Sequence, residues 1–302
     1  MSRNKDIDLI ILSKIDNLDL LNICQINKYF SKLCSNQDFW RNKTWKEYAK
    51  IYPEKDQTWK NMYMKLVCYM NKYSYKKTKE SFFDSIEKGH LEVVKFLSTL
   101  PNVDVTANGN WGIKRGSTYG HLEVVKFLST LPKVDVTAGD NCAISMASEN
   151  GHLEVVKFLS GLSNVDASAD DNYAIIWTSW KGHLEVVKFL STLPNVDASA
   201  DDNYAIRLAS KAGHLEVVKF LSTLPNVDAS VDDNYAIKKA SKNGHLEVVK
   251  FLSGLPNVDA SADDNYAIKK ASKNGHSEIV KFLCVLDWVK KNPQYNINIE
   301  DI

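Results

Sequence analysis

Seven histidines are the side chains of this sequence best suited to bind a metal ion or to transfer a proton, because imidazole does both near neutral pH. Each follows a glycine, and the Gly-His pairs recur at one constant interval, with the histidines at His90, His121, His152, His183, His214, His245 and His276. One ring per repeat, on helix layers about 10 Å apart, is too widely spaced for a shared ion. We therefore predict no metal site and expect the rings to satisfy backbone groups near a turn.

Four aspartate pairs could, by residue type, carry out acid–base chemistry: Asp170 and Asp171, Asp201 and Asp202, Asp232 and Asp233, and Asp263 and Asp264. A catalytic dyad needs one pocket that separates two pKa values, whereas these pairs are four copies in a row. The sequence also has no GxGxxG, GxxxxGKS/T, HExxH or GxSxG motif. We expect a noncatalytic protein without a cofactor, in which the aspartates cap helices.

One copy of the repeat, DDNYAIKKASKNGHLEVVKFLSGLPNVDASA, indicates which helices and turns position these residues. The triplet at residues 232–234 is expected to cap a first helix over residues 235–243. Gly244 ends that helix, because glycine adopts the left-handed conformation without strain. A second helix begins at or near His245, and Pro256 stops it.

Two helices this short are not stable alone in water, so the copies must stack to bury a core. Small residues recur at one position of the first helix, interrupted only by Thr178: Gly116, Ala147, Ala209, Ala240 and Ala271. This pattern predicts a mainly α fold, a solenoid of seven 31-residue helix-turn-helix repeats over residues 76–292 with a tail at 293–302. In the last copy Asp287 replaces the proline, so the final helix is expected to extend through Trp288 and to seal the core.

The phrase GHLEVVKFL, preceded by the small-residue column and followed by a turn, resembles the second half of an ankyrin repeat. The first half departs from that family, since YAIKKA stands where TPLHxA is usual, and the period is shorter than the one usual in the family. NYAI together with GHLEVVKFL is similar to the ankyrin arrays of mimivirus-like giant viruses. The resemblance implies a protein-binding array that acts inside the cell, in the host cytoplasm.

Residues 1–75 do not repeat and show helical spacing, with Ser35 and Asp38 as a possible capping box. Over residues 3–45 their order of features resembles an F-box, although the usual Leu-Pro is absent at Arg3 and Asn4. That resemblance implies docking to the Skp-type linker of a cullin-RING ubiquitin ligase. The residues that match the motif are Ile11, Leu12, Leu20, Leu21, Lys28, Phe30 and Trp40.

Positions that differ between nearly identical copies are the candidates for partner recognition. They are Arg115, Tyr119, Trp177, Trp180, Lys181, Arg207 and Lys211. Because lysine occupies the position of Trp177 in later copies, we expect that site to be exposed and Trp177 with Trp180 to form an aromatic anchor. The alternative is that Trp177 packs into the core across Thr178. A lysine-rich face on the last two copies is interpreted as a solvated helix surface.

Charge and cysteine content complete the expectations. Residues 1–80 carry a net charge of +7 and residues 81–302 a net charge of −6, which argues against nucleic-acid binding by the array. Five scattered cysteines indicate no disulfide framework, and no apolar run is long enough to span a membrane. We predict a monomeric adaptor that presents a protein to a ubiquitin ligase. The alternatives are a plain scaffold that binds or sequesters a host protein, and a nucleic-acid-binding head.

Overall fold

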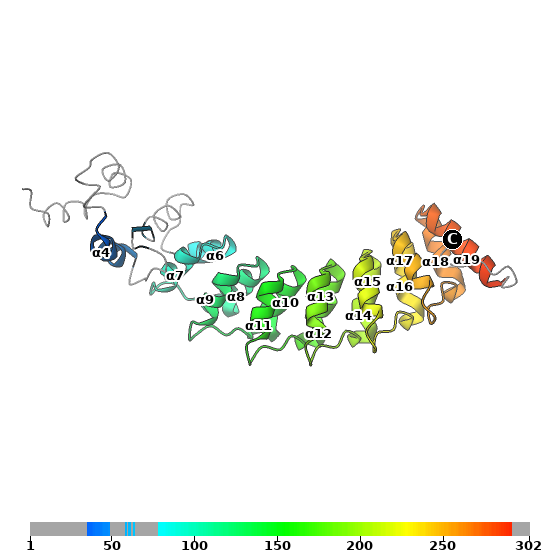
Figure 1. Cartoon of the computed structure of the whole chain (residues 1–302), viewed down its shortest axis with the longest axis horizontal. Helices are drawn as coiled ribbons and strands as arrows, with labels where there is room; N and C mark the ends of the chain where they lie inside the picture. Colours follow the sequence, from blue (N-terminus) through cyan, green and yellow to red (C-terminus); the bar gives the residue numbers. More distant parts are fainter. Residues whose placement is uncertain (1–34, 49–57, 59, 62, 64–77, 292–302) are drawn as a thin grey trace, which may run out of the picture. The chain divides into compact units, whose positions relative to one another are not determined.

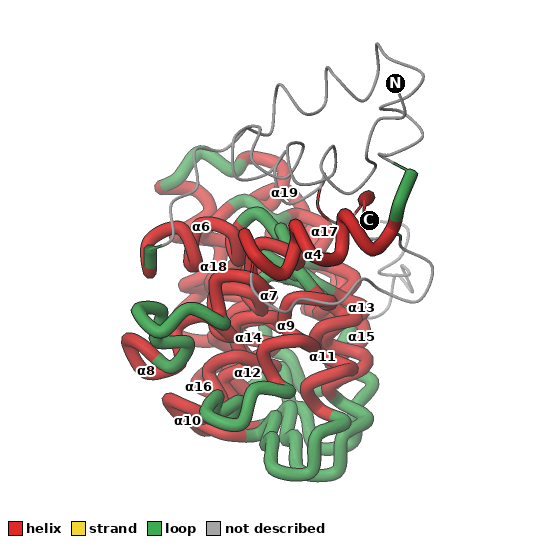
Figure 2. The backbone as a smooth tube through the Cα atoms, turned by 90° about the vertical axis from the view of Figure 1, so that its left-hand side faces the viewer, coloured by secondary structure: helices red, strands yellow, loops and turns green. Residues whose placement is uncertain are grey.

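The computed structural model describes residues 35–48, 58, 60–61, 63 and 78–291 of the chain (Figure 1). These residues form helices and loops, and no strand occurs among them (Figure 2). The chain divides into two compact units, residues 1–116 with 123–134, and residues 117–122 with 135–302. Six residues predicted to dock a ligase linker lie outside the described part: Ile11, Leu12, Leu20, Leu21, Lys28 and Phe30.

The described part of the head is helix α4, Gln37–Tyr48. Its first turn is capped by Asn36, whose Oδ1 accepts hydrogen bonds from the backbone N–H groups of Asp38 (2.9 Å) and Phe39 (3.3 Å). The predicted capping box with Ser35 is therefore wrong by one residue. Asparagine and serine are nearly equal as caps, so the sequence alone did not separate them.

Trp40 belongs to the core of the head. Its side chain is fully buried, with the ring of Phe39 at 4.9 Å and that of Tyr63 at 5.3 Å between centroids. A fully buried ring cannot touch a docking partner directly. The prediction that Trp40 contacts a ligase linker is corrected to a role in packing α4.

Seven helix pairs follow in residues 78–291. The first helices of the pairs are α6 Lys79–Glu87, α8 Ala107–Thr118, α10 Ala138–Glu149, α12 Ala169–Lys181, α14 Ala200–Ala212, α16 Val231–Asn243 and α18 Ala262–Lys273. The second helices are α7 Leu91–Ser98, α9 Leu122–Ser129, α11 Leu153–Ser160, α13 Leu184–Leu190, α15 Leu215–Ser222, α17 Leu246–Ser253 and α19 Ser277–Lys291.

Within the unit that contains residues 135–302, the pairs stack in two rows. The first helices α10, α12, α14, α16 and α18 each contact the next, and so do the second helices from α11 to α19 (Figure 1). The two valines and the last leucine of every LEVVKFL are at most 2% exposed. Ala147, Thr178, Ala209, Ala240 and Ala271 are fully buried. The predicted small-residue column is therefore confirmed as part of the core between the stacked copies.

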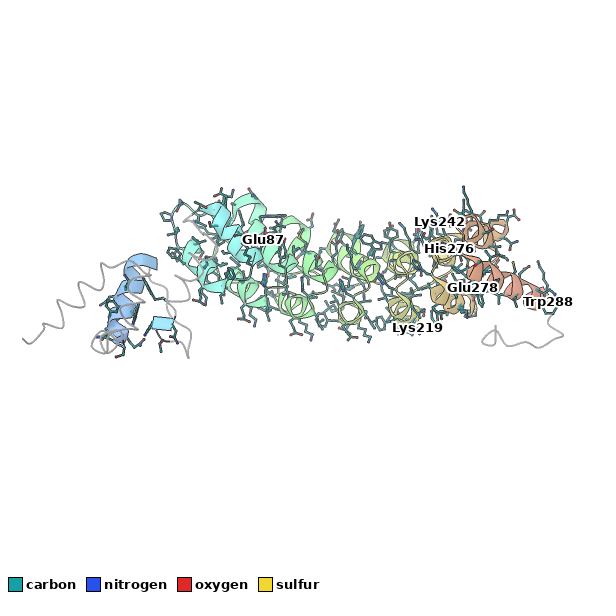
Figure 3. The ribbon with its side chains drawn as sticks, turned by 90° about the horizontal axis from the view of Figure 1, so that it is seen from above. Glu87, Lys219, Lys242, His276, Glu278 and Trp288 are labelled. Atoms are coloured by element: carbon teal, nitrogen blue, oxygen red, sulfur yellow. The ribbon has the colours of Figure 1, made fainter. Side chains whose placement is uncertain are left out.

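The Gly-His pair joins one copy to the next. The Nε2–H of His276 donates to the backbone carbonyl of Lys242, in the preceding copy, at 3.0 Å, and Figure 3 shows the two residues close together. The same ring covers Gly244, where a Cβ would lie 2.7 Å from His276 Cε1. Gly244 also has a φ of 87°. Glycine is therefore required for its conformation and for the room it leaves. The backbone role predicted for the histidines is confirmed for His152, His245 and His276, whose rings bind carbonyls of the preceding copy.

The Asp-Asp-Asn triplets do not cap helices as predicted. Asp232, Asp233 and Asn234 have φ values of 53°, 51° and 61°, so three consecutive residues are left-handed and the regular helix begins after them. Asparagine and aspartate tolerate this conformation better than other residues with a Cβ.

Each triplet before the last instead binds, through its asparagine, the loop that leads to the next triplet. Asn234 Oδ1 accepts the backbone N–H of Asp259, in the loop that leads to the next triplet, at 2.7 Å. The Asp259 carboxylate in turn accepts the N–H (2.9 Å) and the hydroxyl (2.7 Å) of Ser261. The same contact joins Asn141 to Asp166, Asn172 to Asp197 and Asn203 to Asp228. We call this contact the asparagine latch.

The last helix, α19, extends through Trp288 as predicted. Trp288 itself is 47% exposed, so it does not seal the core. Leu283 and Leu286 are buried and occupy the inner face of α19. The periodicity of the helix therefore continues past the missing proline, with the tryptophan on the outer side.

Candidate functional site

Three aromatic side chains of α12 form one cluster, which we call the α12 ring cluster: Tyr173, Trp177 and Trp180. Trp177 stacks on Tyr173 with the ring centroids 5.3 Å apart and 30° between the ring planes. Trp180 meets Trp177 edge to face at 5.2 Å and 86°. Such pairs contribute stabilisation beyond the area that they bury.

Both tryptophans are half-buried rather than exposed as predicted. Each ring of the α12 ring cluster covers part of its neighbour, which lowers the exposure of all three. We expected the position of Trp177 to be exposed because later copies carry lysine there. In the following copy that position is Leu208, which is only 4% exposed. A position that takes lysine in one copy can thus be buried in another, because the neighbouring side chains differ.

The rim of the cluster is polar. Lys181 Nζ lies 4.4 Å from the centroid of the Trp180 ring and 3.8 Å from a carboxylate oxygen of Glu149. Burial raises the pKa of the Tyr173 hydroxyl, and the negative charge of Glu149, to which it is hydrogen-bonded, raises it further. A protonated hydroxyl and an ammonium group thus border the rings.

A groove of about 450 Å³ opens beside the cluster, along α12 and α14. Its walls carry three carboxylates and three aromatic rings: Asp170, Asp171, Asp201, Tyr173, Trp177 and Tyr204. Ile176 also lines it and is 5% exposed. The groove therefore combines negative charge with ring faces, a combination that attracts cations.

Arg207 is not free to bind a partner, contrary to prediction. Its side chain is 14% exposed and lies 2.5 Å from a carboxylate oxygen of Asp232. Its guanidinium carbon lies 4.5 Å from the ring centroid of Tyr235 and 5.4 Å from that of Tyr204. Its charge is satisfied within the chain.

The other predicted partner-binding residues are spread over the chain. Lys211 is exposed, and its backbone carbonyl accepts the side-chain amide of Asn243. Tyr119 is 43% exposed and stacks on His121. Arg115 belongs to the other compact unit, where it pairs with Glu87. Of the seven residues, Trp177, Trp180 and Lys181 lie together on α12, and Arg207 and Lys211 lie on α14.

Most of the lysine-rich face on the last two copies is engaged within the chain. Lys239 and Lys270 lie over Tyr235 and Tyr266, at 4.6 and 4.9 Å from the ring centroids. Lys269 pairs with Asp264, and this partner lowers the pKa of the Asp264 carboxyl. Lys242, Lys269 and Lys273 are exposed, so the face is a solvated helix surface as interpreted, with part of its charge paired within the chain.

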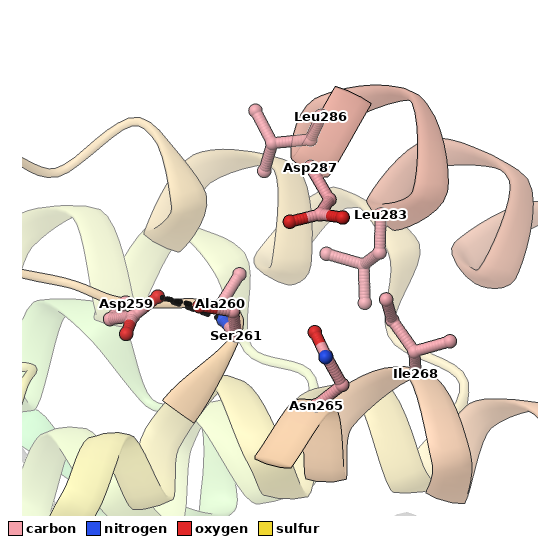
Figure 4. A pocket seen from close by; sticks show the side chains of 8 residues that line it. All are labelled: Asp259, Ala260, Ser261, Asn265, Ile268, Leu283, Leu286 and Asp287. Carbon is pink, nitrogen blue, oxygen red and sulfur yellow. Dashed lines mark hydrogen bonds between the residues drawn. The ribbon is translucent and has the colours of Figure 1, made fainter. Parts of the chain in front are cut away.

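A second cavity, between α18 and α19, is too small to hold more than a water molecule. Figure 4 shows Leu283, Leu286 and Asp287 of α19 facing Asn265 and Ile268 across it. Its volume is about 30 Å³. Asn265 Oδ1 is buried there and has no hydrogen-bond partner among the described residues, because α19 continues as a helix where the other copies have the loop whose N–H completes the asparagine latch.

Sequence reasoning missed Tyr173, Tyr204 and Asp201 as site residues. Tyrosine and aspartate recur at these positions in several copies, so they were assigned to the framework. The signal that marks them is the neighbouring column, which reads Ile176, Arg207 and Lys238 in consecutive copies. Only the folded chain shows that this column faces those rings.

The repeats of the chain match a known protein family. A family model described as ankyrin repeats (three copies) matches residues 113–202, 144–233 and 206–299, which together span more than half of the chain. No curated protein matches the sequence. Within the described residues, no helix is both long and apolar enough to cross a membrane, and no three metal-ligating side chains gather.

Proposed function

Because the chain belongs to the ankyrin-repeat family, whose repeats bind protein partners and are typically noncatalytic, we propose that it captures a partner protein through the faces of α12 and α14. The α12 ring cluster with its adjoining groove carries this proposal. Tryptophan is the residue type most enriched at the energetic centres of protein interfaces. Both tryptophans keep part of their surface exposed.

The cluster is also a point where the array departs from its own pattern. At the positions of Trp177 and Trp180 the two last copies have lysine, namely Lys239, Lys242, Lys270 and Lys273. Framework positions repeat because every interface between copies is alike, whereas a surface used for recognition is under no such constraint. The aromatic surface is therefore favoured as the contact that distinguishes one partner from another.

The matched test replaces both tryptophans by the residue that other copies already carry. The double variant Trp177→Lys and Trp180→Lys of the full chain should melt within a few degrees of the wild type. Proteins that cross-link to the wild-type array should be lost from the variant and retained by the control Lys270→Ala. A large fall in the melting temperature would assign the rings to the fold, and unchanged capture would place the binding surface elsewhere.

For the head, we propose recruitment of the Skp-type linker of a cullin-RING ubiquitin ligase, which would bring a captured protein close to the ligase. The proposal is supported by the resemblance over residues 3–45, and the burial of Trp40 agrees with a folded helical head. The likeness of the array to those of giant viruses suggests that the captured protein belongs to a host and that the complex forms in its cytoplasm.

Binding of the full chain to a purified Skp-type linker tests the ligase proposal. Micromolar binding that is lost in Leu20→Asp and in Phe30→Asp, while the array keeps its melting temperature, would support recruitment. If the wild type does not bind, the chain is a plain scaffold that binds or sequesters its partner. The array proposal would then stand without the ligase.

A further inference from the structure

We propose that the groove along α12 and α14 binds an arginine side chain of the partner, between the rings of Tyr173 and Tyr204 and against the carboxylate of Asp201. The inference rests on the proposed function, because it specifies what the array binds beside the α12 ring cluster. It is carried by a comparison of this groove with the next two along the same chain.

The following groove, between α14 and α16, already holds a guanidinium. Arg207 of α14 lies over Tyr204 and Tyr235, at 5.4 and 4.5 Å from the ring centroids, and pairs with Asp232. With only 14% of its side chain exposed, the cation has lost most of its water. In this groove the guanidinium is held by two rings, one carboxylate and the backbone carbonyl of Asp202, to which it donates a hydrogen bond of 3.4 Å.

The groove after that, between α16 and α18, holds an ammonium in the same way. Lys238, which occupies the position of Arg207 in the next copy, lies 5.5 Å from the ring centroid of Tyr266 and 3.4 Å from a carboxylate oxygen of Asp263. Its side chain is 12% exposed. Two successive copies thus use one set of positions to bury a cation.

The α12–α14 groove has the rings and the carboxylate but no cation. One repeat before Arg207, Tyr235 and Asp232 stand Ile176, Tyr204 and Asp201, and all three line the groove. Isoleucine cannot pair with a carboxylate, and no lysine, arginine or histidine of the described residues forms an ion pair with Asp201. In the groove one copy earlier, between α10 and α12, one of the two tyrosine rings is missing, because Cys142 stands at the position of Tyr173.

An ammonium also fits this set of positions, as Lys238 shows, but the groove offers more contacts to a planar cation. A guanidinium can stack on ring faces and donate two hydrogen bonds to one carboxylate at the same time, which an ammonium cannot. Trp177 adds a third ring, and Asp170 with Asp171 adds negative charge that disfavours anionic ligands. The volume of about 450 Å³ leaves room for the side chain and its neighbouring backbone.

The test uses the full chain and the tripeptide acetyl-Gly-Arg-Gly-amide, followed by tryptophan fluorescence and by backbone NMR shifts. Shifts are expected in residues 169–181 and 200–207. The same peptide with citrulline, which keeps the shape but not the charge, should not bind. Asp201→Asn should weaken binding about tenfold, the loss expected for one charge-assisted hydrogen bond. Equal responses to arginine and citrulline, or none to arginine, would overturn the inference.

A second variant tests occupancy of the groove directly. Ile176→Arg gives α12 the residue that α14 carries at the same position, so its guanidinium should fill the groove and abolish peptide binding without lowering the melting temperature. Peptide binding that persists in folded Ile176→Arg would place the peptide elsewhere and overturn the inference. If the tripeptide fails to bind while capture of proteins still depends on Trp177 and Trp180, the groove assignment falls and the proposed function stands.

Discussion

Thr178 is the one residue of the small-residue column whose side chain carries a polar atom into the core. It is fully buried, and its hydroxyl oxygen has no hydrogen-bond partner among the described residues. A buried polar group without a partner costs about 1–3 kcal/mol. The copies that carry alanine at this position avoid that cost.

Exchange of threonine and alanine within the column should therefore have opposite effects on stability. Thr178→Ala is expected to raise the free energy of unfolding by about 0.5–1 kcal/mol, because part of the gain is offset by the lost methyl group. Ala209→Thr should lower it by about 1–3 kcal/mol through overpacking and an unpaired hydroxyl. Urea unfolding of both variants measures the difference. A clear loss in Thr178→Ala would mean that the hydroxyl does have a partner.

His183 makes the stability of the array depend on pH. Burial lowers the pKa of its imidazole from 6.5, the charges of His152, His214 and Lys181 lower it further, and its hydrogen bond to the Glu149 backbone only partly opposes this. As the pH falls, His183 is therefore protonated at a higher pH in the unfolded chain than in the folded chain. The contribution of neutral His183 to stability is complete above pH 6.5 and is lost as the pH falls below that value towards the folded-state pKa.

Removal of this titration should flatten the pH dependence of stability. Between pH 7.5 and pH 5.5, the wild type should lose more of its free energy of unfolding than His183→Asn, which keeps a hydrogen-bond donor but does not titrate. Urea unfolding at both pH values provides the measurement. Equal losses in the two proteins would show that the folded and unfolded chains hold the His183 proton equally well.

At the scale of the element, the asparagine latch is the contact that local sequence patterns could not reveal. Asp-Asp-Asn before an apolar run satisfies the rule for a helix cap and equally the rule for left-handed residues. The choice is made by a backbone N–H that lies almost a full copy away along the chain. By contrast, the glycine that ends each first helix and the burial of LEVVKFL follow from local spacing, and both were predicted correctly.

The free energy of one asparagine latch can be measured with a matched pair of variants. Asn203 and Asn265 have the same φ of 59°, so alanine is equally strained at both. Asn203 Oδ1 accepts the N–H of Asp228 at 2.8 Å, whereas Asn265 Oδ1 has no partner among the described residues. Asn203→Ala should therefore destabilise the array by about 1–3 kcal/mol more than Asn265→Ala. Equal effects in calorimetry would remove the hydrogen bond as a source of stability.

The α12 ring cluster shows the same limit of prediction for the candidate site. The aromatic residues were identified by their departure from the repeat, but their exposure depends on ring contacts between Tyr173, Trp177 and Trp180. The internal pairing of Arg207 depends on Asp232 of the next copy. Contacts between copies therefore decide which variable residues remain open to a partner.

At the scale of the whole molecule, stability should fall towards the last copy. Helix α13 contacts α11 and α15, whereas α19 has a second-helix neighbour only in α17. In arrays held together by nearest neighbours, terminal copies open more often than internal ones. Amides of residues 277–288 should exchange with solvent faster than those of residues 184–190 in native-state hydrogen exchange. Equal protection would indicate that the end of the array is covered.

The identical joints between copies also bear on how such a chain can change in length. Five glycines, from Gly120 to Gly244, each meet the histidine of the next copy, and four asparagines, from Asn141 to Asn234, each bind the aspartate 25 residues later. Recombination between two copies of the coding sequence adds or removes a whole number of repeats and so rejoins matching partners. Copy number can drift while each joint survives, and the α12 ring cluster can be moved nearer to or farther from the head without being altered.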